Sequence, residues 1–402
     1  MSALAAYYTE HAVSQLLVSQ LTIPHAHRML DLGVGKGSLL CAAVNRWPDS
    51  RILAADLDPR GFDSLRRRYP KIHLIQTDGL NAHSCPKFAV EPGSIDVAVC
   101  NPPYLNLTET EDYSALLKEA GLPRCSRLKH LTSDVVFLAQ NLRLLRKGGE
   151  LGIILPDSVI SGCLFKPLRE DLLEHHELFG VIQMPRSIFR NTEALTHILL
   201  LRRSGKRLPT ITLYQANATM ALGQLLEISA ASARKRMDYG YWKWRSAHSN
   251  DSLLTLASIG AEIKRGTITR KACLARGLTH FHTGDFPDAP ENPLFFHRLE
   301  HSEKHLAKKG DILLARVGSR CVGRVAIVAR GSRPFTDCIY RIRVPECYRA
   351  AVLESMAGKS GQQWFQAHAH GVCAQVISKA DLLSFPINFS SSSTDSVLHE
   401  TP

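Results

Sequence analysis

The segment LDLGVGKGSLL, residues 30–40, decides the fold class of this chain. A short apolar run contains Asp31, and Gly33, Gly35 and Gly37 follow before an apolar segment with helical spacing. Glycine lets the backbone turn tightly and pass close to a ligand, so these glycines are candidate cofactor contacts. A strand, a glycine-rich turn and a helix in this order are typical of nucleotide-binding α/β folds.

Further apolar runs alternate with helix-like segments through the first 200 residues. The candidate strands are 28–32, 51–56, 71–75, 95–100, 150–156, 178–184 and 196–202. Most of the intervals suit a crossover helix, which predicts a Rossmann-like α/β domain with a seven-stranded, mostly parallel sheet covered on both faces. The last two runs can pair directly, which would place an antiparallel strand at the sheet edge.

The net charge of +12 in this 402-residue chain lies entirely in its second half. Residues 1–200 carry 21 Lys+Arg and 21 Asp+Glu, whereas residues 201–402 carry 28 and 16. A neutral half followed by a basic half favours a polyanionic partner for the second half. Many basic proteins bind nothing acidic, so charge alone leaves both interpretations open.

The basic link RRSGKRLPT contains Gly and Pro and predicts a domain boundary. We expect a first domain at 1–205, an α+β domain at 206–390, with helical patches near 219–236 and 348–367, and a flexible Ser-rich tail at 391–402. No apolar run is long enough to predict a membrane span, and the N-terminus lacks a signal-peptide pattern. Ten cysteines without a CxxC pair predict reduced thiols, a cytoplasmic protein and no metal site.

Acidic residues end or follow three successive predicted strands, at the sheet edge where open α/β folds bind ligands. Asp31 adjoins the glycine-rich turn, where a carboxylate suits a cationic ligand such as S-adenosylmethionine, with its α-amino and sulfonium groups. Asp56 can accept hydrogen bonds from two ribose hydroxyls, and Asp78 can accept one from an adenine amino group. Each acid alone could be a helix cap or a solvated turn, but three at one edge favour a cofactor site.

The fourth predicted strand runs into Asn101, Pro102, Pro103 and Tyr104. Neither proline can donate to a sheet and both fix φ, so the strand ends in a rigid loop. The carbonyls of the Asn101 side chain and of Pro102 can accept from one amine, and the Tyr104 ring can stack on a planar group. These four residues are candidate catalytic residues for methylating an exocyclic amine, the alternative being a rigid turn without chemistry.

This motif, together with YYTEH (7–11), DLGVGKG and the acids of the next two strands, resembles the gamma-class N6-adenine DNA methyltransferases. That family includes type I modification subunits and type II NPPY methyltransferases. The resemblance implies that Tyr8 and Thr9 contact the methionine end of the cofactor, although Glu10 replaces the usual proline. It also implies that Phe189 and Tyr104 stack on opposite faces of a flipped adenine, with a core phenylalanine as the alternative for Phe189.

Most of residues 250–390 resembles a target recognition domain of type I specificity subunits. Its segment GDILLARVGSRCVGRVAIVARG (310–331) predicts two strands joined by a Gly/Arg-rich turn. Basic side chains on such a turn can contact phosphates or guanine, or can simply improve solubility. The candidate DNA-binding residues are Lys308, Lys309, Arg316, Arg320 and Arg324.

The sequence thus predicts a site-specific adenine DNA methyltransferase of a restriction-modification or related defence system. Its expected cofactor is S-adenosylmethionine, its expected partner is double-stranded DNA, and it would act as a monomer or homodimer in the bacterial cytoplasm, at the nucleoid. A restriction endonuclease or another defence-complex subunit is a further candidate partner. The alternatives are an RNA or protein-glutamine methyltransferase with the same motif, or a modification or recognition subunit of a larger complex.

Overall fold

The computed structural model describes residues 9–81, 90–107, 112–128, 130–186, 188, 194–248, 254–290, 292–297, 306–318, 320–371 and 374–388. These residues form two compact units. The first unit extends to Lys243 and also includes Gly371, and the second begins at Trp244. The predicted boundary at residue 205 therefore falls inside the first unit.

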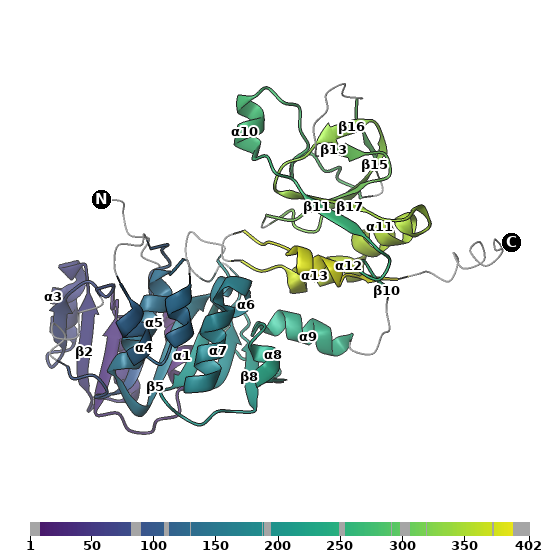
Figure 1. Cartoon of the computed structure of the whole chain (residues 1–402). Helices are drawn as coiled ribbons and strands as arrows, with labels where there is room; N and C mark the ends of the chain where they lie inside the picture. Colours follow the sequence, from purple (N-terminus) through teal and green to yellow (C-terminus); the bar gives the residue numbers. More distant parts are fainter. Residues whose placement is uncertain are drawn as a thin grey trace. The chain divides into compact units, whose positions relative to one another are not determined.

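A nine-stranded sheet forms the centre of the first unit (Figure 1). Its strands are β1 (Arg28–Leu32), β2 (Arg51–Asp56), β3 (His73–Gln76), β4 (Ile95–Cys100), β5 (Leu145–Pro156), β6 (Glu177–Gln183), β7 (Thr196–Arg202), β8 (Thr210–Gln215) and β9 (Leu226–Ser229). Their order is β3-β2-β1-β4-β5-β7-β6-β8-β9. The neighbouring pairs from β3 to β5 are all parallel, which confirms the predicted mostly parallel sheet.

The far side of this sheet differs from the prediction. β7 is antiparallel to both β5 and β6, so the direct pairing of the last two predicted strands is confirmed, but β7 does not lie at the edge. β8 pairs in parallel with β6, and β9 pairs antiparallel with β8. The predicted count of seven strands is therefore two strands short, because the basic link leads into β8 and not into a separate domain.

Helices cover both faces of the sheet. The helices of the first unit are α1 (His11–Ser19), α2 (Ser38–Arg46), α3 (Phe62–Arg68), α4 (Ser114–Glu119), α5 (Ser133–Leu144), α6 (Asp157–Ser161), α7 (Lys166–His175) and α8 (Ala230–Ala233). The helix α9 (Tyr239–Ala247) contains the boundary between the two units. Leu30 and Leu32 of β1 join a core with α4, α5 and α7, whereas Met29 joins a core with α1, α2 and α3. Successive side chains of a strand point to opposite faces, which explains the two cores.

The second unit is built on a five-stranded sheet of order β11-β17-β14-β15-β12. Its elements are β10 (Leu254–Thr255), β11 (Glu262–Arg265), α10 (Arg270–Ala275), β12 (Leu294–Phe295), β13 (Leu306–Lys308), β14 (Ile312–Ala315), β15 (Val325–Arg330), β16 (Ser332–Pro334), β17 (Ile339–Arg343), α11 (Arg349–Ala357), α12 (Lys359–His368), α13 (Lys379–Leu383) and β18 (Pro386–Ile387). The antiparallel pair β14–β15 confirms the two strands predicted in 310–331.

The two helical patches predicted for the second half have different outcomes. α11 and α12 confirm the patch near 348–367, whereas 219–236 contains β9 and the four-residue α8. Within the described part of the chain, no helix has the length and apolar character that crossing a membrane requires.

Candidate active site

The glycine-rich turn after β1 adopts a conformation that requires glycine. Gly33, Gly35 and Gly37 have φ angles of +78°, +49° and +77°, a region that other residues rarely occupy. A Cβ on Gly37 would also lie 2.5 Å from a methyl carbon of Leu65. The main-chain N–H of Gly33 donates to the carbonyl of Ala55 at 2.8 Å, which fixes the turn against β2.

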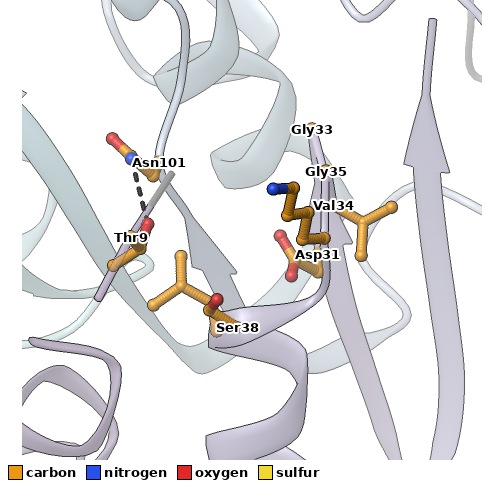
Figure 2. Close-up of a pocket in the computed structure, with 9 residues that line it drawn as sticks. Thr9, Asp31, Gly33, Val34, Gly35, Ser38 and Asn101 are labelled. Carbon is orange, nitrogen blue, oxygen red and sulfur yellow. Dashed lines mark hydrogen bonds between the residues drawn. The ribbon is translucent and has the colours of Figure 1, made fainter. Parts of the chain in front are cut away.

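A pocket opens beside this turn (Figure 2). It is lined by Thr9, Asp31, Gly33, Val34, Gly35, Lys36, Ser38, Leu39 and Asn101. The structure thus brings together predicted cofactor residues from the N-terminal segment, β1 and the glycine-rich turn with the predicted catalytic Asn101. These residues are far apart in the sequence, and the parallel order β1-β4 places them at one edge of the sheet.

Asp31 gives this pocket its electrostatic character. Its side chain is buried, with 1% of the residue exposed, and Oδ1 has no hydrogen-bond partner. Burial and the neighbouring charge of Asp56 raise the pKa of Asp31 to about 8. A buried carboxylate oxygen without a partner is unfavourable unless a cation or donor completes it. The pocket therefore fits a cationic ligand, as the α-amino group of S-adenosylmethionine would be.

Asp56 and Asp78 lie at the same edge, after β2 and β3 respectively. Asp56 accepts hydrogen bonds from the N–H groups of Gly35 (2.7 Å) and Asp58 (2.9 Å), so it also stabilises the glycine-rich turn. Asp78 is exposed and accepts from the N–H of Leu80 at 2.9 Å. Their predicted bonds to ribose and adenine remain predictions.

The side-chain amide of Asn101 has a defined orientation. Its Nδ2 donates to the Thr9 hydroxyl at 3.0 Å, as Figure 2 shows, and its Oδ1 accepts from the Tyr104 hydroxyl at 3.1 Å. The Tyr104 hydroxyl also lies 3.3 Å from the carbonyl of Ile154 in β5. Because Thr9 takes the donor end of the amide, the acceptor Oδ1 faces Tyr104.

Ser133, at the start of α5, holds the loop at Pro103 and Leu105 in place. Its hydroxyl donates to the carbonyl of Pro103 and accepts from the N–H of Leu105 at 2.8 Å. Its main-chain N–H donates to the carbonyl of Leu105 at 2.9 Å. Sequence reasoning missed Ser133, and the only local signal was a Thr-Ser-Asp run typical of a helix start.

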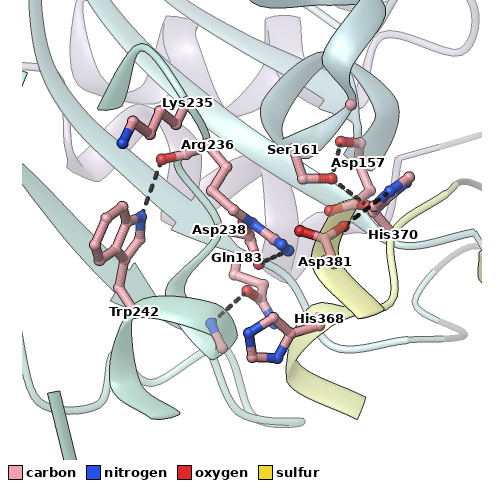
Figure 3. Close-up of polar contacts among 12 residues, drawn as sticks. Asp157, Ser161, Gln183, Lys235, Arg236, Asp238, Trp242, His368, His370 and Asp381 are labelled. Carbon is pink, nitrogen blue, oxygen red and sulfur yellow. Dashed lines mark hydrogen bonds and ion pairs between the residues drawn. The ribbon is translucent and has the colours of Figure 1, made fainter. Parts of the chain in front are cut away.

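A second buried polar cluster follows β5 at the same sheet edge. Figure 3 shows Ser161 directed at Asp157, to whose Oδ2 it donates at 2.8 Å. Nε2 of His197 lies 2.9 Å from Oδ1 of Asp157. Burial alone would raise the pKa of Asp157, but the bonds to His197 and Ser161 and the charge of His197 hold that pKa below its usual value. Sequence reasoning did not identify this cluster, which joins the end of β5 to the start of β7.

The predicted DNA-binding residues of the second unit divide into two groups. Arg316 and Arg324 already bond within the fold: Arg316 donates to the carbonyl of Asp337 at 3.3 Å, and Arg324 donates to the carbonyl of Pro287 at 2.9 Å. The exposed group comprises Lys308, Lys309 and Arg320. The predicted Tyr8 and Phe189 lie outside the described residues. Among those the structure describes, no group of His, Cys, Asp and Glu could hold a metal ion.

Two family models match the chain. The N-6 DNA Methylase family matches residues 66–252, and the methyltransferase small domain matches residues 10–121. The first unit has the fold of an S-adenosylmethionine-dependent methyltransferase domain. Its β1 turn and Asn101 loop lie in the segments that these models cover.

Curated relatives of several substrate classes are similar to this chain. The release factor glutamine methyltransferase of Chlorobaculum tepidum is 30% identical over 152 residues, covering 35% of this chain and 50% of the relative. The type II methyltransferase M.PstI of Providencia stuartii is 25% identical over 241 residues, covering 54% of this chain and 46% of the relative. A tRNA1(Val) (adenine(37)-N6)-methyltransferase of Vibrio campbellii is 27% identical over 112 residues, covering 25% and 46%. The chain spans about half the length of these relatives.

Solved structures give only weak similarities. The type IIG restriction endonuclease BpuSI aligns with a TM-score of 0.47 and 12% identity, over 96% of this chain and 59% of that one. The type I restriction-modification methyltransferase subunit from Streptococcus thermophilus aligns with a TM-score of 0.43 and 20% identity, over 61% of this chain and 54% of that one.

Proposed function

We propose that this chain transfers the methyl group of S-adenosylmethionine to N6 of adenine within a short, specific DNA sequence. The observation that carries the proposal is the Asn101 amide, fixed by Thr9 at the rim of a pocket that contains Asp31, whose Oδ1 has no hydrogen-bond partner. The match of the N-6 DNA Methylase family to residues 66–252 supports the adenine N6 assignment.

The residues of the loop fit the chemistry of an aromatic amine. The cofactor supplies a methyl group activated by its positive sulfur. Oδ1 of Asn101 and the carbonyl of Pro102 would accept the two N–H groups of the amine, drawing its lone pair out of conjugation with the ring. In this structure the Tyr104 hydroxyl donates a hydrogen bond to Oδ1 of Asn101. The substrate amine therefore has to displace this hydroxyl or share Oδ1 with it. The proton then leaves the methylated amine, so no strong base is required.

The target adenine must leave the DNA stack before it can reach Asn101. Extruding a base costs a few kcal/mol. Stacking on an aromatic ring returns about 1–3 kcal/mol per base. We assign this stacking to Tyr104 and Phe189, and we assign the methionine end of the cofactor to Tyr8 and Thr9.

We assign DNA target recognition to the second unit. Residues 244–402 carry 20 Lys+Arg and 14 Asp+Glu, and this excess of positive charge supports the role. Lys308, Lys309, Arg316, Arg320 and Arg324 are the proposed contacts. A restriction-modification or related defence system is the proposed context, in which cleavage would come from a partner protein.

A second candidate function is methylation of a protein glutamine or of an RNA adenine. The similarity to a release factor glutamine methyltransferase, over 152 residues, specifically favours it. A side-chain amide, like adenine, presents a planar NH₂ group to the loop. The basic second unit favours a nucleic acid over a protein substrate, and the 152-residue match covers only 35% of this chain. The resemblance of most of residues 250–390 to a target recognition domain favours DNA over RNA.

Transfer of labelled methyl from S-adenosylmethionine distinguishes these functions. The purified full chain is offered duplex DNA, total RNA and a protein extract, with Asn101→Ala as the matched inactive variant. We expect label only in DNA, and sequencing of DNA from expressing cells should place N6-methyladenine in one short motif. Label in RNA or protein but not in DNA would refute the DNA assignment.

A further inference from the structure

One segment of the second unit is uniformly basic. Residues 264–282, here called the basic arm, contain five Lys/Arg, two His and no Asp/Glu. These residues are Lys264, Arg265, Arg270, Lys271, Arg276, His280 and His282. The arm begins in β11 and continues into α10, which lies outside the five-stranded sheet (Figure 1).

α10 presents its cations to solvent. Thr269 caps the helix by accepting from the N–H of Ala272 at 3.2 Å, and Cys273 is the residue that α10 buries. Arg270, Lys271 and Arg276 are exposed, and none of them forms an ion pair with any residue described in the structure. Three neighbouring uncompensated cations repel one another, an arrangement that a polyanion would relieve.

Two arginines converge beside this helix. Arg265, at the end of β11, and Arg316, directly after β14, flank β17 from both sides. Nε of Arg265 lies 3.0 Å and Nη1 of Arg316 lies 3.3 Å from the main-chain carbonyl of Asp337. Nη2 of Arg265 also lies 3.3 Å from a carboxylate oxygen of Asp337, so Asp337 orients both guanidinium groups. Each guanidinium carries five N–H donors in a planar fork suited to phosphate.

His282 connects the arginine pair with α10. Its Nδ1 lies 2.8 Å from the hydroxyl of Thr336, the residue before Asp337. The main-chain N–H of Asp337 donates to the carbonyl of Ile268 at 2.9 Å, and Ile268 lies two residues before α10. The cations of α10 and the arginine pair therefore belong to one surface.

We propose that the basic arm, together with Arg316, is the surface of the second unit that contacts the phosphate backbone of duplex DNA. This inference rests on the proposed function. Cations spread over a strand end and a helix fit a row of phosphates better than a single small anion.

The test is the salt dependence of duplex binding by the full chain, followed by fluorescence anisotropy. The variant Arg270→Ala/Lys271→Ala/Arg276→Ala removes three exposed cations. The charge-matched control Arg28→Ala/Arg51→Ala/Lys71→Ala removes three exposed cations at the amino ends of β1 and β2 and before β3, opposite the edge with Asn101.

Each phosphate contact contributes about 0.9 to the slope of log K against log[salt], so loss of three should reduce the slope by about 2.7. Counterion release alone then predicts an affinity about 10²-fold weaker at 0.15 M salt. We expect the control variant to keep the slope of the wild type, and Arg270→Lys/Arg276→Lys to keep it as well.

Three results would overturn the inference. If the arm variant keeps the wild-type melting temperature and the wild-type slope of log K against log[salt], the phosphate contacts lie elsewhere. If the arm and control variants lose the same DNA affinity, the loss comes from net charge and not from the arm. A wild-type chain that does not bind duplex DNA would remove the proposed function itself. That failure is distinguishable, because it is seen before any substitution is made.

Discussion

The raised pKa of Asp31 predicts that cofactor binding depends steeply on pH. Its carboxyl is buried, lacks a partner at Oδ1 and has a pKa of about 8. A cationic α-amino group binds the ionised carboxylate, so below pH 8 binding must first expel a proton. Above pH 8 the amino group, with an ordinary pKa of about 7.7–8.0, loses its own proton. Affinity should therefore peak near pH 8.

The size of this pH effect on affinity follows from two fractions, that of ionised Asp31 carboxylate and that of protonated α-amino group. Their product is about 0.01 at pH 6 and about 0.2 at pH 8, which predicts about 20-fold tighter binding at pH 8. At pH 7 about 0.8 proton should be released per cofactor bound. Isothermal titration calorimetry in buffers of different ionisation enthalpy measures both quantities.

Asp31→Asn should bind weakly and show no rise in affinity between pH 6 and pH 8. The control Asp78→Asn alters an exposed acid at the same edge and should keep the rise. A wild-type affinity that is equal at pH 6 and pH 8, or a rise that persists in Asp31→Asn, would refute the assignment of Asp31 to the amino group.

The same pKa predicts a change in stability without cofactor. The free carboxyl titrates near 3.8, whereas the folded one titrates near 8, so the unfolded state binds fewer protons between these values. Stability therefore falls as pH rises from about 4 to 8. Asp31→Asn should then melt at a higher temperature than the wild type at pH 8, which differential scanning calorimetry can measure.

Three further predictions concern the active-site loop and the glycine-rich turn. Asn101→Ala should abolish methyl transfer yet leave cofactor affinity nearly unchanged, and equal losses in both assays would contradict its role. Ser133→Ala leaves the carbonyl of Pro103 and the N–H of Leu105 without their side-chain partner, so we expect a loss of about 1–3 kcal/mol in unfolding free energy and a lower kcat. Gly37→Ala, at a φ of +77°, should cost about 1–2 kcal/mol and weaken cofactor binding, and an unchanged melting temperature would disagree.

The local pattern of the sequence was sufficient to predict the strands near the cofactor. β1, β2 and β4 have the predicted bounds, because a buried strand is a short apolar run that glycine, acidic residues or proline end. The same reasoning placed Asp31, Asp56 and Asn101 at one sheet edge, since successive parallel strands carry their carboxyl ends to the same side.

Contacts between distant segments decided the rest. β8 joins the sheet through its pairing with β6, about 30 residues earlier, and no local pattern distinguishes that pairing from a linker. The orientation of Asn101 depends on Thr9, 92 residues away, and that of Pro103 depends on Ser133. Hydrogen bonds between such distant residues follow from the packed fold and not from the composition of either segment.

The basic arm shows the same division. Sequence alone determined that the second half is basic, because charge is a sum over residues. Only the tertiary structure placed Arg265 beside Arg316, since both flank β17 and share the carbonyl of Asp337. The tertiary structure also places Arg324 next to the main-chain carbonyls of Phe286 and Pro287, to which it donates hydrogen bonds. A guanidinium on a partly buried turn donates to the nearest acceptors.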